Sequence, residues 1–184
     1  MARTRSNSLV ALKFFVTRKF GAEGWERFLK ATPADDRRFL DMPSMNDWHD
    51  LVTFLRALHT LAETFQPGGT ALVHEFGRYE AERDLNTVER LFLRLVNPAT
   101  VVEKLGSYWS KFNDYGEWTV TREGPKVARA VFDASPQPDP IHCAELMGYL
   151  GRVMELCGGR EVTVEHTECR GQGGSHCTFV GRWA

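Results

Sequence analysis

The chain has 184 residues, of which 42% are hydrophobic and 11% aromatic, which is enough to build the core of one domain. It carries 23 basic and 24 acidic residues, a formal net charge of -1, so its overall charge does not favour nucleic acid or an anionic membrane as a partner.

The first quarter of the chain predicts short amphipathic helices behind a mobile N-terminus, residues 1–8. Apolar residues at helical spacing predict helices over 9–21 and 24–32, the first ending at Gly21. The apolar run of the first helix contains Lys13 and is too short to span a bilayer, and no small-residue cleavage site follows it. We therefore expect a cytoplasmic protein without a membrane span, in which the four cysteines are reduced thiols or metal ligands.

Further helices are expected up to residue 116. Thr32 is the expected N-cap of the next helix, with Pro33 at its first position. Helices are also predicted over 67–85, 86–97 and 98–116. Between them, an apolar stripe predicts a long helix over 44–65, at Trp48, Leu51, Val52, Leu55, Leu58 and Phe65.

The period of the apolar pattern changes from residue 117 onward. Alternation predicts strands over 117–124 and 126–136, and again over 160–169 and 176–183, with a helix over 141–159 between the two pairs. The expected fold class is α+β, with a helical N-terminal layer packed on a small antiparallel sheet ordered strand, strand, helix, strand, strand. We expect one domain over residues 9–184, with a helical part at 9–97 and a mixed part at 98–184.

Three cysteines of the mixed part carry a resemblance to a known family. Cys143 opens the helix, Cys169 closes a strand and Cys177 follows eight positions later before "TFV". This arrangement, over residues 98–184, resembles the 4-vinyl reductase domain family. That family belongs to the ligand-binding superfamily of haem-based nitric-oxide sensors, TRAPP vesicle-tethering subunits and aromatic-sensing domains of bacterial transcription activators. The upstream segments "FLRALHTLAETF" and "FGRYEAERDL" resemble a myxobacterial group of proteins of unassigned function.

The spacing of the cysteines limits which of them can share a metal ion. In a hairpin that turns near Gly173, Cys169 and Cys177 stand opposite one another, with β-carbons about 5 Å apart. Cys143 and Cys157 are 14 residues apart on one predicted helix, and a rise of ~1.5 Å per residue separates them by roughly 21 Å. One ion cannot bind both, and the residues alone also allow all of these thiols to be ordinary buried side chains.

The resemblance implies a closed, structural zinc site. Its ligands would be Cys143, Cys169, Cys177 and His166, the last at a position where the aromatic-sensing relatives have an acidic residue. Strict strand alternation places His166 on the face opposite Cys169, so both can reach one ion only if the strand contains a bulge or ends early. Cys157 is expected in the core. The alternative fourth ligands are Glu168, His176 and His142.

The densest group of aromatic residues is a candidate ligand pocket. Its position across a helix end and the first strand would allow it to enclose an apolar volume, although ordinary core or dimer packing explains such a group equally well. The resemblance implies that a small hydrophobic or aromatic ligand binds there, between sheet and helices. The five residues are Tyr108, Trp109, Phe112, Tyr115 and Trp118.

No catalytic motif competes with these two sites. The glycines at 171–174 lie in a hairpin rather than in a phosphate-binding loop, His74 and Glu75 lack the second histidine of a metalloprotease helix, and no serine lies in a nucleophile elbow. We therefore expect a protein that is not an enzyme.

The expected function is a small-molecule-binding sensory or regulatory domain with structural zinc, acting as a homodimer and on an effector protein in trans. One alternative is a scaffold subunit resembling the TRAPP tethering subunits. The other is a haem or tetrapyrrole sensor with His74 as axial ligand. Haem is not expected as a cofactor, because in "YWSKF" Phe112 stands where the haem sensors have a propionate-binding arginine.

Overall fold

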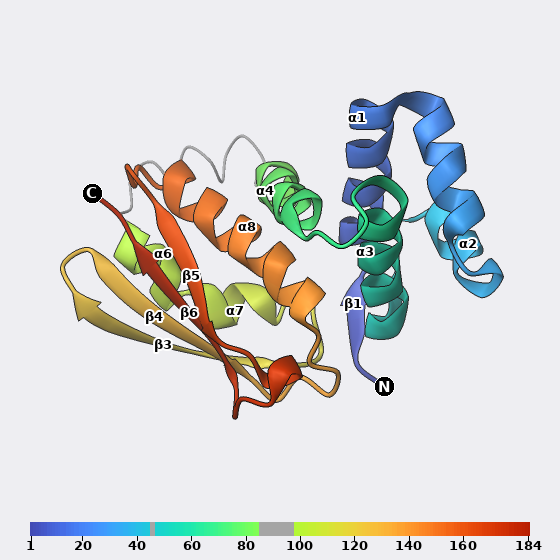
Figure 1. The fold of residues 1–184 in the computed structure, drawn as a ribbon. Helices are drawn as coiled ribbons and strands as arrows, with labels where there is room; N and C mark the ends of the chain where they lie inside the picture. Colours follow the sequence, from blue (N-terminus) through green and yellow to red (C-terminus); the bar gives the residue numbers. More distant parts are fainter. Residues whose placement is uncertain (45–46, 85–97) are drawn as a thin grey trace.

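The second half of the chain is an antiparallel sheet crossed by one long helix (Figure 1). This computed structural model describes residues 1–44, 47–84 and 98–184. The predicted order of strand, strand, helix, strand, strand is confirmed, and with it the α+β fold class. These elements are β3 (Glu117–Gly124), β4 (Val127–Asp133), α8 (Pro140–Leu156), β5 (Thr163–Glu168) and β6 (Cys177–Arg182).

The order of the strands across the sheet is β3-β4-β6-β5, and every neighbouring pair is antiparallel. Because the last strand of the chain lies between β4 and β5, β6 is buried along most of its length, whereas β5 is an edge strand that alternates between exposed and half-buried residues. On β4 the alternate residues Ala128, Ala130 and Phe132 are buried. The two alanines line a small gap beneath α8, which identifies the inner face of the sheet.

The helices form layers on that inner face (Figure 1). α8 lies over the sheet, α4 packs beside α8, and α1 and α3 lie beyond α4. A continuous hydrophobic core runs through these layers, from Leu12 of α1 through Phe76 of α4 to Phe179 of β6. The remaining helices have the bounds α1 (Asn7–Ala31), α2 (Ala34–Asp41), α3 (Leu51–Phe65), α4 (Ala71–Asp84), α6 (Pro98–Glu103) and α7 (Leu105–Trp109).

Two glycines allow α4 and α8 to approach each other at backbone distance. A β-carbon built on Gly77 would lie 2.0 Å from the carbonyl oxygen of Glu145, and one built on Gly148 would lie 2.0 Å from that of His74. Neither position has room for a side chain unless the helices move apart. Glu80 and Glu145 each lie three residues from one of these glycines and are therefore on the same helix faces, inside the contact.

The N-terminal segment is paired, although the sequence predicts a mobile end at residues 1–8. Arg3–Arg5 form β1, which pairs antiparallel with β2 (Trp48–Asp50), so the helix predicted over 44–65 begins only at Leu51. Trp48 is consequently not part of an apolar stripe: it is 36% exposed, and its ring lies 5.5 Å from the Arg3 guanidinium and 5.1 Å from that of Arg5. Because β2 pairs with β1, the ring of Trp48 makes cation–π contacts with the two arginines instead of packing in a helix–helix interface.

Other boundaries differ from the sequence-based expectation. Thr32 does not cap α2; its hydroxyl donates a hydrogen bond to the carbonyl of Phe28 at 3.0 Å and so closes α1, and Pro33 takes the N-cap position. The predicted break at Gly21 is a kink inside α1, where φ is 74°. The helix predicted over 98–116 is divided into α6 and α7. The helix predicted over 86–97 lies outside the described residues.

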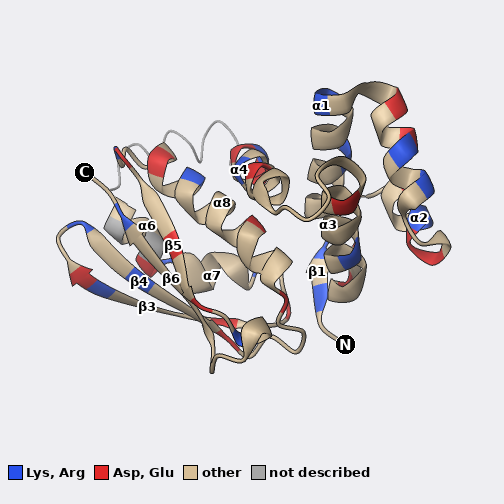
Figure 2. Cartoon of the chain, in the orientation of Figure 1, with Lys and Arg blue, Asp and Glu red and all other residues tan. Residues whose placement is uncertain are grey.

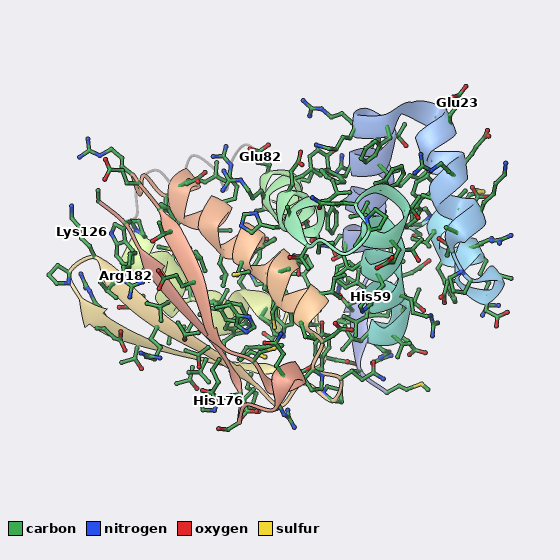
Figure 3. The ribbon with its side chains drawn as sticks, viewed as in Figure 1. Glu23, His59, Glu82, Lys126, His176 and Arg182 are labelled. Atoms are coloured by element: carbon green, nitrogen blue, oxygen red, sulfur yellow. The ribbon has the colours of Figure 1, made fainter. Side chains whose placement is uncertain are left out.

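Charged side chains of both signs are interspersed over the helices and strands (Figure 2), as the net charge of -1 suggests. Several that are labelled in Figure 3, among them Glu23, Lys126 and Arg182, point outward from the molecule. In the described ranges, no helix combines the length and the apolar character that a bilayer crossing requires.

The contact between α4 and α8 predicts opposite effects for two substitutions on one helix. Gly148→Ala should lower the free energy of unfolding by about 1–3 kcal/mol, because its methyl group would overlap the His74 carbonyl. Gly151→Ala is the matched control: its β-carbon would meet Val164 at 3.7 Å, an ordinary contact, so better helix propensity should leave stability unchanged or raise it by up to about 1 kcal/mol. Urea unfolding measures both, and equal effects would contradict the close approach.

A second prediction concerns acid stability. His49 of β2 is buried with its Nδ1 3.2 Å from the Ser6 hydroxyl, and burial lowers its pKa from 6.5 to about 4, partly opposed by Asp50. The folded state therefore disfavours the charged ring, and the stability this confers above pH 6.5 is lost as the pH falls towards 4, on the order of 3 kcal/mol. His49→Gln should flatten this part of the profile relative to the wild type. A variant whose stability still falls between pH 6.5 and 4 as the wild type's does would contradict this assignment.

Candidate functional site

The four residues predicted to bind a metal ion come together in the structure. Cys143 lies in the first turn of α8, His166 lies on β5, Cys169 follows β5 and Cys177 begins β6. One potential ligand atom from each lies within 4.8 Å of all the others. The Sγ atoms of Cys143 and Cys177 are 3.5 Å apart, and all three thiols are buried. Three thiolates and one imidazole at such separations match the ligands and size of a tetrahedral zinc site.

A β-bulge brings His166 to the side of the cysteines. His166 pairs with Phe179 and Glu168 pairs with Thr178, so the register shifts by one residue at Thr167. The extra residue reverses the alternation that would otherwise point His166 away from Cys169. Of the two possibilities that the sequence allows for this site, a bulge or an early strand end, the structure contains the bulge. The His166 ring is also held in place, since it stacks on Phe179 with centroids 4.8 Å apart.

The hydrogen bonds around Cys177 favour its thiolate. The Cys143 thiol donates to the Sγ of Cys177 at 3.5 Å, and the backbone N–H of Arg170 donates to the same sulfur at 3.4 Å. The bond from Cys143 is the largest effect, and together they lower the pKa of Cys177 to about 4 although burial opposes the shift. A thiol whose ionised form is favoured, facing two further thiols and an imidazole, offers the kind of ligands that a metal cation binds.

The alternative fourth ligands have other partners. Glu168 accepts a hydrogen bond from the backbone N–H of Ser175 at 2.8 Å and forms an ion pair with His176 at 3.2 Å, on the surface of the hairpin. His142 points to the other side of α8, where its Nε2 lies 3.6 Å from Glu145. Cys157 is the C-cap of α8, one helix length away from Cys143, and is buried there as the sequence predicts.

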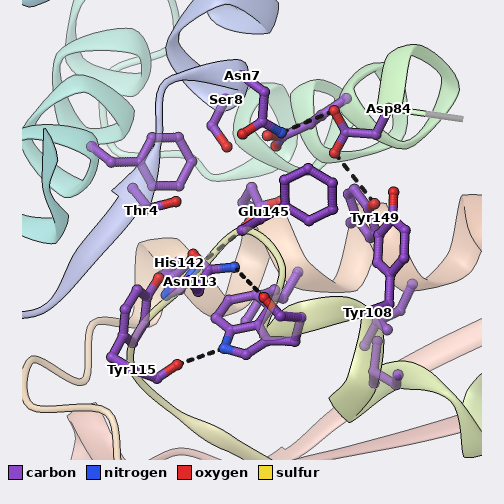
Figure 4. A pocket seen from close by; sticks show the side chains of 17 residues that line it. Thr4, Asn7, Ser8, Asp84, Tyr108, Asn113, Tyr115, His142, Glu145 and Tyr149 are labelled. Atoms are coloured by element: carbon purple, nitrogen blue, oxygen red, sulfur yellow. Dashed lines mark hydrogen bonds and ion pairs between the residues drawn. The ribbon is translucent and has the colours of Figure 1, made fainter. Parts of the chain in front are cut away.

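A cavity of about 50 Å³ lies on the opposite side of α8, between α1, α4 and α7 (Figure 4). Of the five aromatic residues predicted to form a pocket, Tyr108, Trp109, Phe112 and Tyr115 line it. Trp118 does not line it; its ring stacks on Phe132 with centroids 4.7 Å apart and lies 5.9 Å from that of Trp109, which does line the cavity. The cavity therefore lies among helices. The gap over the sheet itself is smaller, about 30 Å³, and is lined by apolar residues.

The polar lining of this cavity is not foreseen by the sequence. Glu80 and Glu145 are fully buried at the contact of α4 and α8 and share a hydrogen bond. Burial raises the pKa of Glu145 to about 8 and that of Glu80 well above its usual range, where the charge of Glu145 adds to the effect. Nearby, Asp84 accepts hydrogen bonds from Asn7 at 3.1 Å and from the hydroxyl of Tyr149 at 3.3 Å (Figure 4).

The sequence offers one signal for these buried acids. A glutamate on an amphipathic helix is ordinarily solvated, so composition alone places Glu80 and Glu145 on the surface. Each lies three residues from a glycine that admits a neighbouring helix, Gly77 or Gly148, but a single sequence does not reveal which glycines serve that purpose.

A family model matches residues 16–184, and its description is "Protein of unknown function (DUF2378)". Solved structures of H-NOX proteins match the whole fold. An H-NOX protein from S. oneidensis in the Fe(II)NO state has a TM-score of 0.78 at 12% identity, with 98% of this chain and 99% of that chain covered. The Fe(II) unliganded H-NOX protein from K. algicida has a TM-score of 0.75 at 11% identity, covering 98% and 96%. The IWP-051-bound H-NOX from Shewanella woodyi in the Fe(II)CO state has a TM-score of 0.68 at 16% identity, with 97% of this chain and 94% of that chain covered. No curated protein matches.

These structural matches correct the expectation about haem. The sequence argues against haem because "YWSKF" lacks the arginine of the haem sensors, but the chain has the same fold as H-NOX proteins whose descriptions name Fe(II), Fe(II)NO, Fe(II)CO and haem distortion. A five-residue motif was too short a basis for that exclusion. Likewise, the comparisons show that the chain has the fold of H-NOX proteins, and none of them names the 4-vinyl reductase family.

Proposed function

The chain belongs to the family described as "Protein of unknown function (DUF2378)", and from its fold and its two sites we propose that it is a small-molecule-binding sensory domain, not an enzyme, with a structural zinc ion. The observation that carries the metal is the convergence of Cys143, His166, Cys169 and Cys177 to within 4.8 Å. Four protein ligands would leave no open position for water, so the ion would fasten the start of α8 to the last hairpin instead of acting in catalysis.

The cavity supports the sensory part of the proposal. His142 and Glu145 line it from the turn of α8 that also contains Cys143, so an ion on one side of the helix would hold the cavity wall on the other. A bound molecule would touch α1 and α4 as well as α8, and could thereby alter how the N-terminal helices rest on the rest of the domain.

Several features of this proposal concern partners. A chain that senses a ligand needs a recipient of the signal, and we propose a homodimer formed through the N-terminal helices and an effector protein in trans. A cytoplasmic location and one domain over residues 9–184 also stay predictions.

A scaffold role resembling that of the TRAPP subunits is the alternative function, in which side chains keep the cavity closed. The cavity volume of about 50 Å³ is compatible with such a filled interior.

Haem sensing is a second candidate, which the shared H-NOX fold favours. The described residues do not form a ready haem site. A site for a ligand as large as a drug occupies roughly 300–1,000 Å³, far above the 50 Å³ of this cavity. Among the described lining residues there are three carboxylates, Glu80, Asp84 and Glu145, and no Lys or Arg to pair with propionates. The His142 side chain lines the cavity, but its Nε2 is already 3.6 Å from a carboxylate oxygen of Glu145. Haem binding would require the aromatic wall to open.

The zinc proposal predicts different outcomes for two cysteine variants. Cys177→Ala should abolish metal binding and lower the melting temperature, because it removes the thiolate at the centre of the cluster. Cys157→Ala is the control at a buried cysteine of the same helix region and should retain about one zinc per chain, while losing some stability from packing. Elemental analysis of protein purified without an affinity tag measures the metal. Chelation should destabilise the wild type and Cys157→Ala, which both hold the ion, and leave Cys177→Ala unchanged.

Well under half an equivalent of zinc in the wild-type protein would overturn the structural-metal proposal. Equal loss of zinc in both variants would show that the wrong helix cysteine has been assigned. Neither result would by itself exclude a ligand-binding cavity, because the residues that line it are not those of the cysteine cluster.

The haem candidate predicts that cavity size limits uptake. Trp109→Ala removes the largest aromatic side chain of the wall and should increase the Soret absorbance per chain in protein purified from cells supplied with haem. Trp48→Ala, at an exposed tryptophan that does not line the cavity, should leave the spectrum of the wild type unchanged. Absence of a Soret band in all three proteins, with folding confirmed by circular dichroism, would remove haem as a candidate.

A further inference from the structure

The lining of the cavity between α1, α4, α7 and α8 is rich in hydrogen-bond acceptors. The carboxyl groups of Glu80, Asp84 and Glu145 come from α4 and α8, and the amide of Asn7 comes from the start of α1 (Figure 4). No Lys or Arg is among the described residues that line it. The described side chains that line this space therefore offer many oxygen lone pairs and no ammonium or guanidinium group.

One of these acceptors has no hydrogen-bond partner among the described residues. Asn7 is only 8% exposed, and its Nδ2 donates to Asp84 at 3.1 Å. Since a carboxylate oxygen accepts, this bond fixes which end of the amide is nitrogen. Its Oδ1 is buried, and no described residue donates a hydrogen bond to it. A buried acceptor left unsatisfied costs about 1–3 kcal/mol, so a ligand that donates a hydrogen bond here would relieve a cost.

The remaining wall is aromatic. Trp109 and Tyr115 pack edge to face with centroids 5.5 Å apart and line the cavity together with Phe54 and Phe112. The electron-rich faces of such rings attract cations, most strongly where water is excluded. Acceptors on one side and aromatic rings on the other are complementary to a positively charged donor that carries an apolar portion.

The geometry points away from a metal ion at this place. The group of Cys, His and acidic residues whose ligand atoms converge is the cysteine cluster, and in the described parts of the chain Glu80, Asp84 and Glu145 form no such group. A water molecule needs at least roughly 10–15 Å³ of such volume, so a cavity of about 50 Å³ admits three or four non-hydrogen atoms.

We propose that this cavity binds a primary ammonium group carried by a small organic molecule. Its three N–H donors would meet Asn7 Oδ1 and the carboxyl groups of Glu80 and Glu145, while its carbon chain would lie against Trp109 and Tyr115. This inference rests on the proposed sensory function and names the class of ligand. It departs from the neutral hydrophobic or aromatic ligand that the sequence suggests, because the buried acids are visible only in the structure.

Matched pairs of amine and alcohol test the charge requirement. The probes are n-propylamine and n-propanol, which fit the cavity as it stands, and benzylamine and benzyl alcohol, which require it to widen. Calorimetry and thermal shift are carried out on the full chain with its metal content verified, at constant ionic strength and at a pH where the amines are protonated. We expect each amine that binds to do so at least tenfold more tightly than its alcohol.

Variants locate the binding in the cavity. Glu80→Gln should weaken amine binding at least tenfold while leaving alcohol binding unchanged, and Glu145→Gln serves as a second variant if the first does not fold. Glu63→Gln, at an exposed position of α3, is the matched control and should bind as the wild type does. Asn7→Leu should also lose affinity, since it removes the unpaired acceptor.

Each outcome bears on the proposal. Alcohols that bind as tightly as amines, or amine binding that survives in Glu80→Gln and Glu145→Gln, would overturn the ammonium inference while a ligand-binding cavity stands. Binding of benzyl alcohol alone would have the same meaning. No response to any of the four probes would overturn both the ammonium inference and the proposed sensory cavity.

Discussion

The close contact of helices α4 and α8 is the constraint on which the rest of this molecule depends. Gly77 and Gly148 let each helix backbone reach the other, and a β-carbon at either position would lie 2.0 Å from a carbonyl oxygen. This contact joins the N-terminal helices to the sheet domain, because α8 lies on the sheet and α1 and α3 pack on α4 (Figure 1). It also sequesters two glutamates that a looser packing would leave in water, and so creates a polar cavity inside an apolar core.

The helix α8 presents different chemistry on its two sides. Neighbouring residues of its first turn diverge: His142 lines the cavity, whereas Cys143 turns to the hairpin and faces Cys177. Asp139 stabilises this turn by accepting a hydrogen bond from the backbone N–H of Ile141 at 2.9 Å. A change in the position of this one turn would therefore move residues of both the cysteine cluster and the cavity. This shared turn is the physical basis for proposing that the two sites are structurally coupled.

The sequence predicts the elements whose signals are local. Period, turn residues and spacing predict the strand pairs, the capped helix after Asp139 and the opposed cysteines. Strand alternation alone shows that His166 and Cys169 can share an ion only if the strand contains a bulge or ends early. What it does not predict depends on distant partners. Trp48 has the spacing of a helix residue but pairs with β1, from the other end of the helical region. The location of the cavity, and the distance of Trp118 from it, depend on how α7 meets α8, for which no local signal exists.

The buried acids show how far a shared fold constrains function. The chain matches H-NOX proteins in the arrangement of helices and sheet at only 10–16% identity, and such a shared fold does not determine which side chains surround a cavity. Here the helix contact that closes the fold also selects what the cavity can hold, since it surrounds a small space with carboxyl groups and aromatic rings. The fold thus accounts for the position of the cavity, and the side chains on α1, α4 and α8 account for the kind of ligand that it could bind. The two questions need separate experiments: metal analysis addresses the site that fastens α8 to the hairpin, and paired amines and alcohols address the ligand of the cavity.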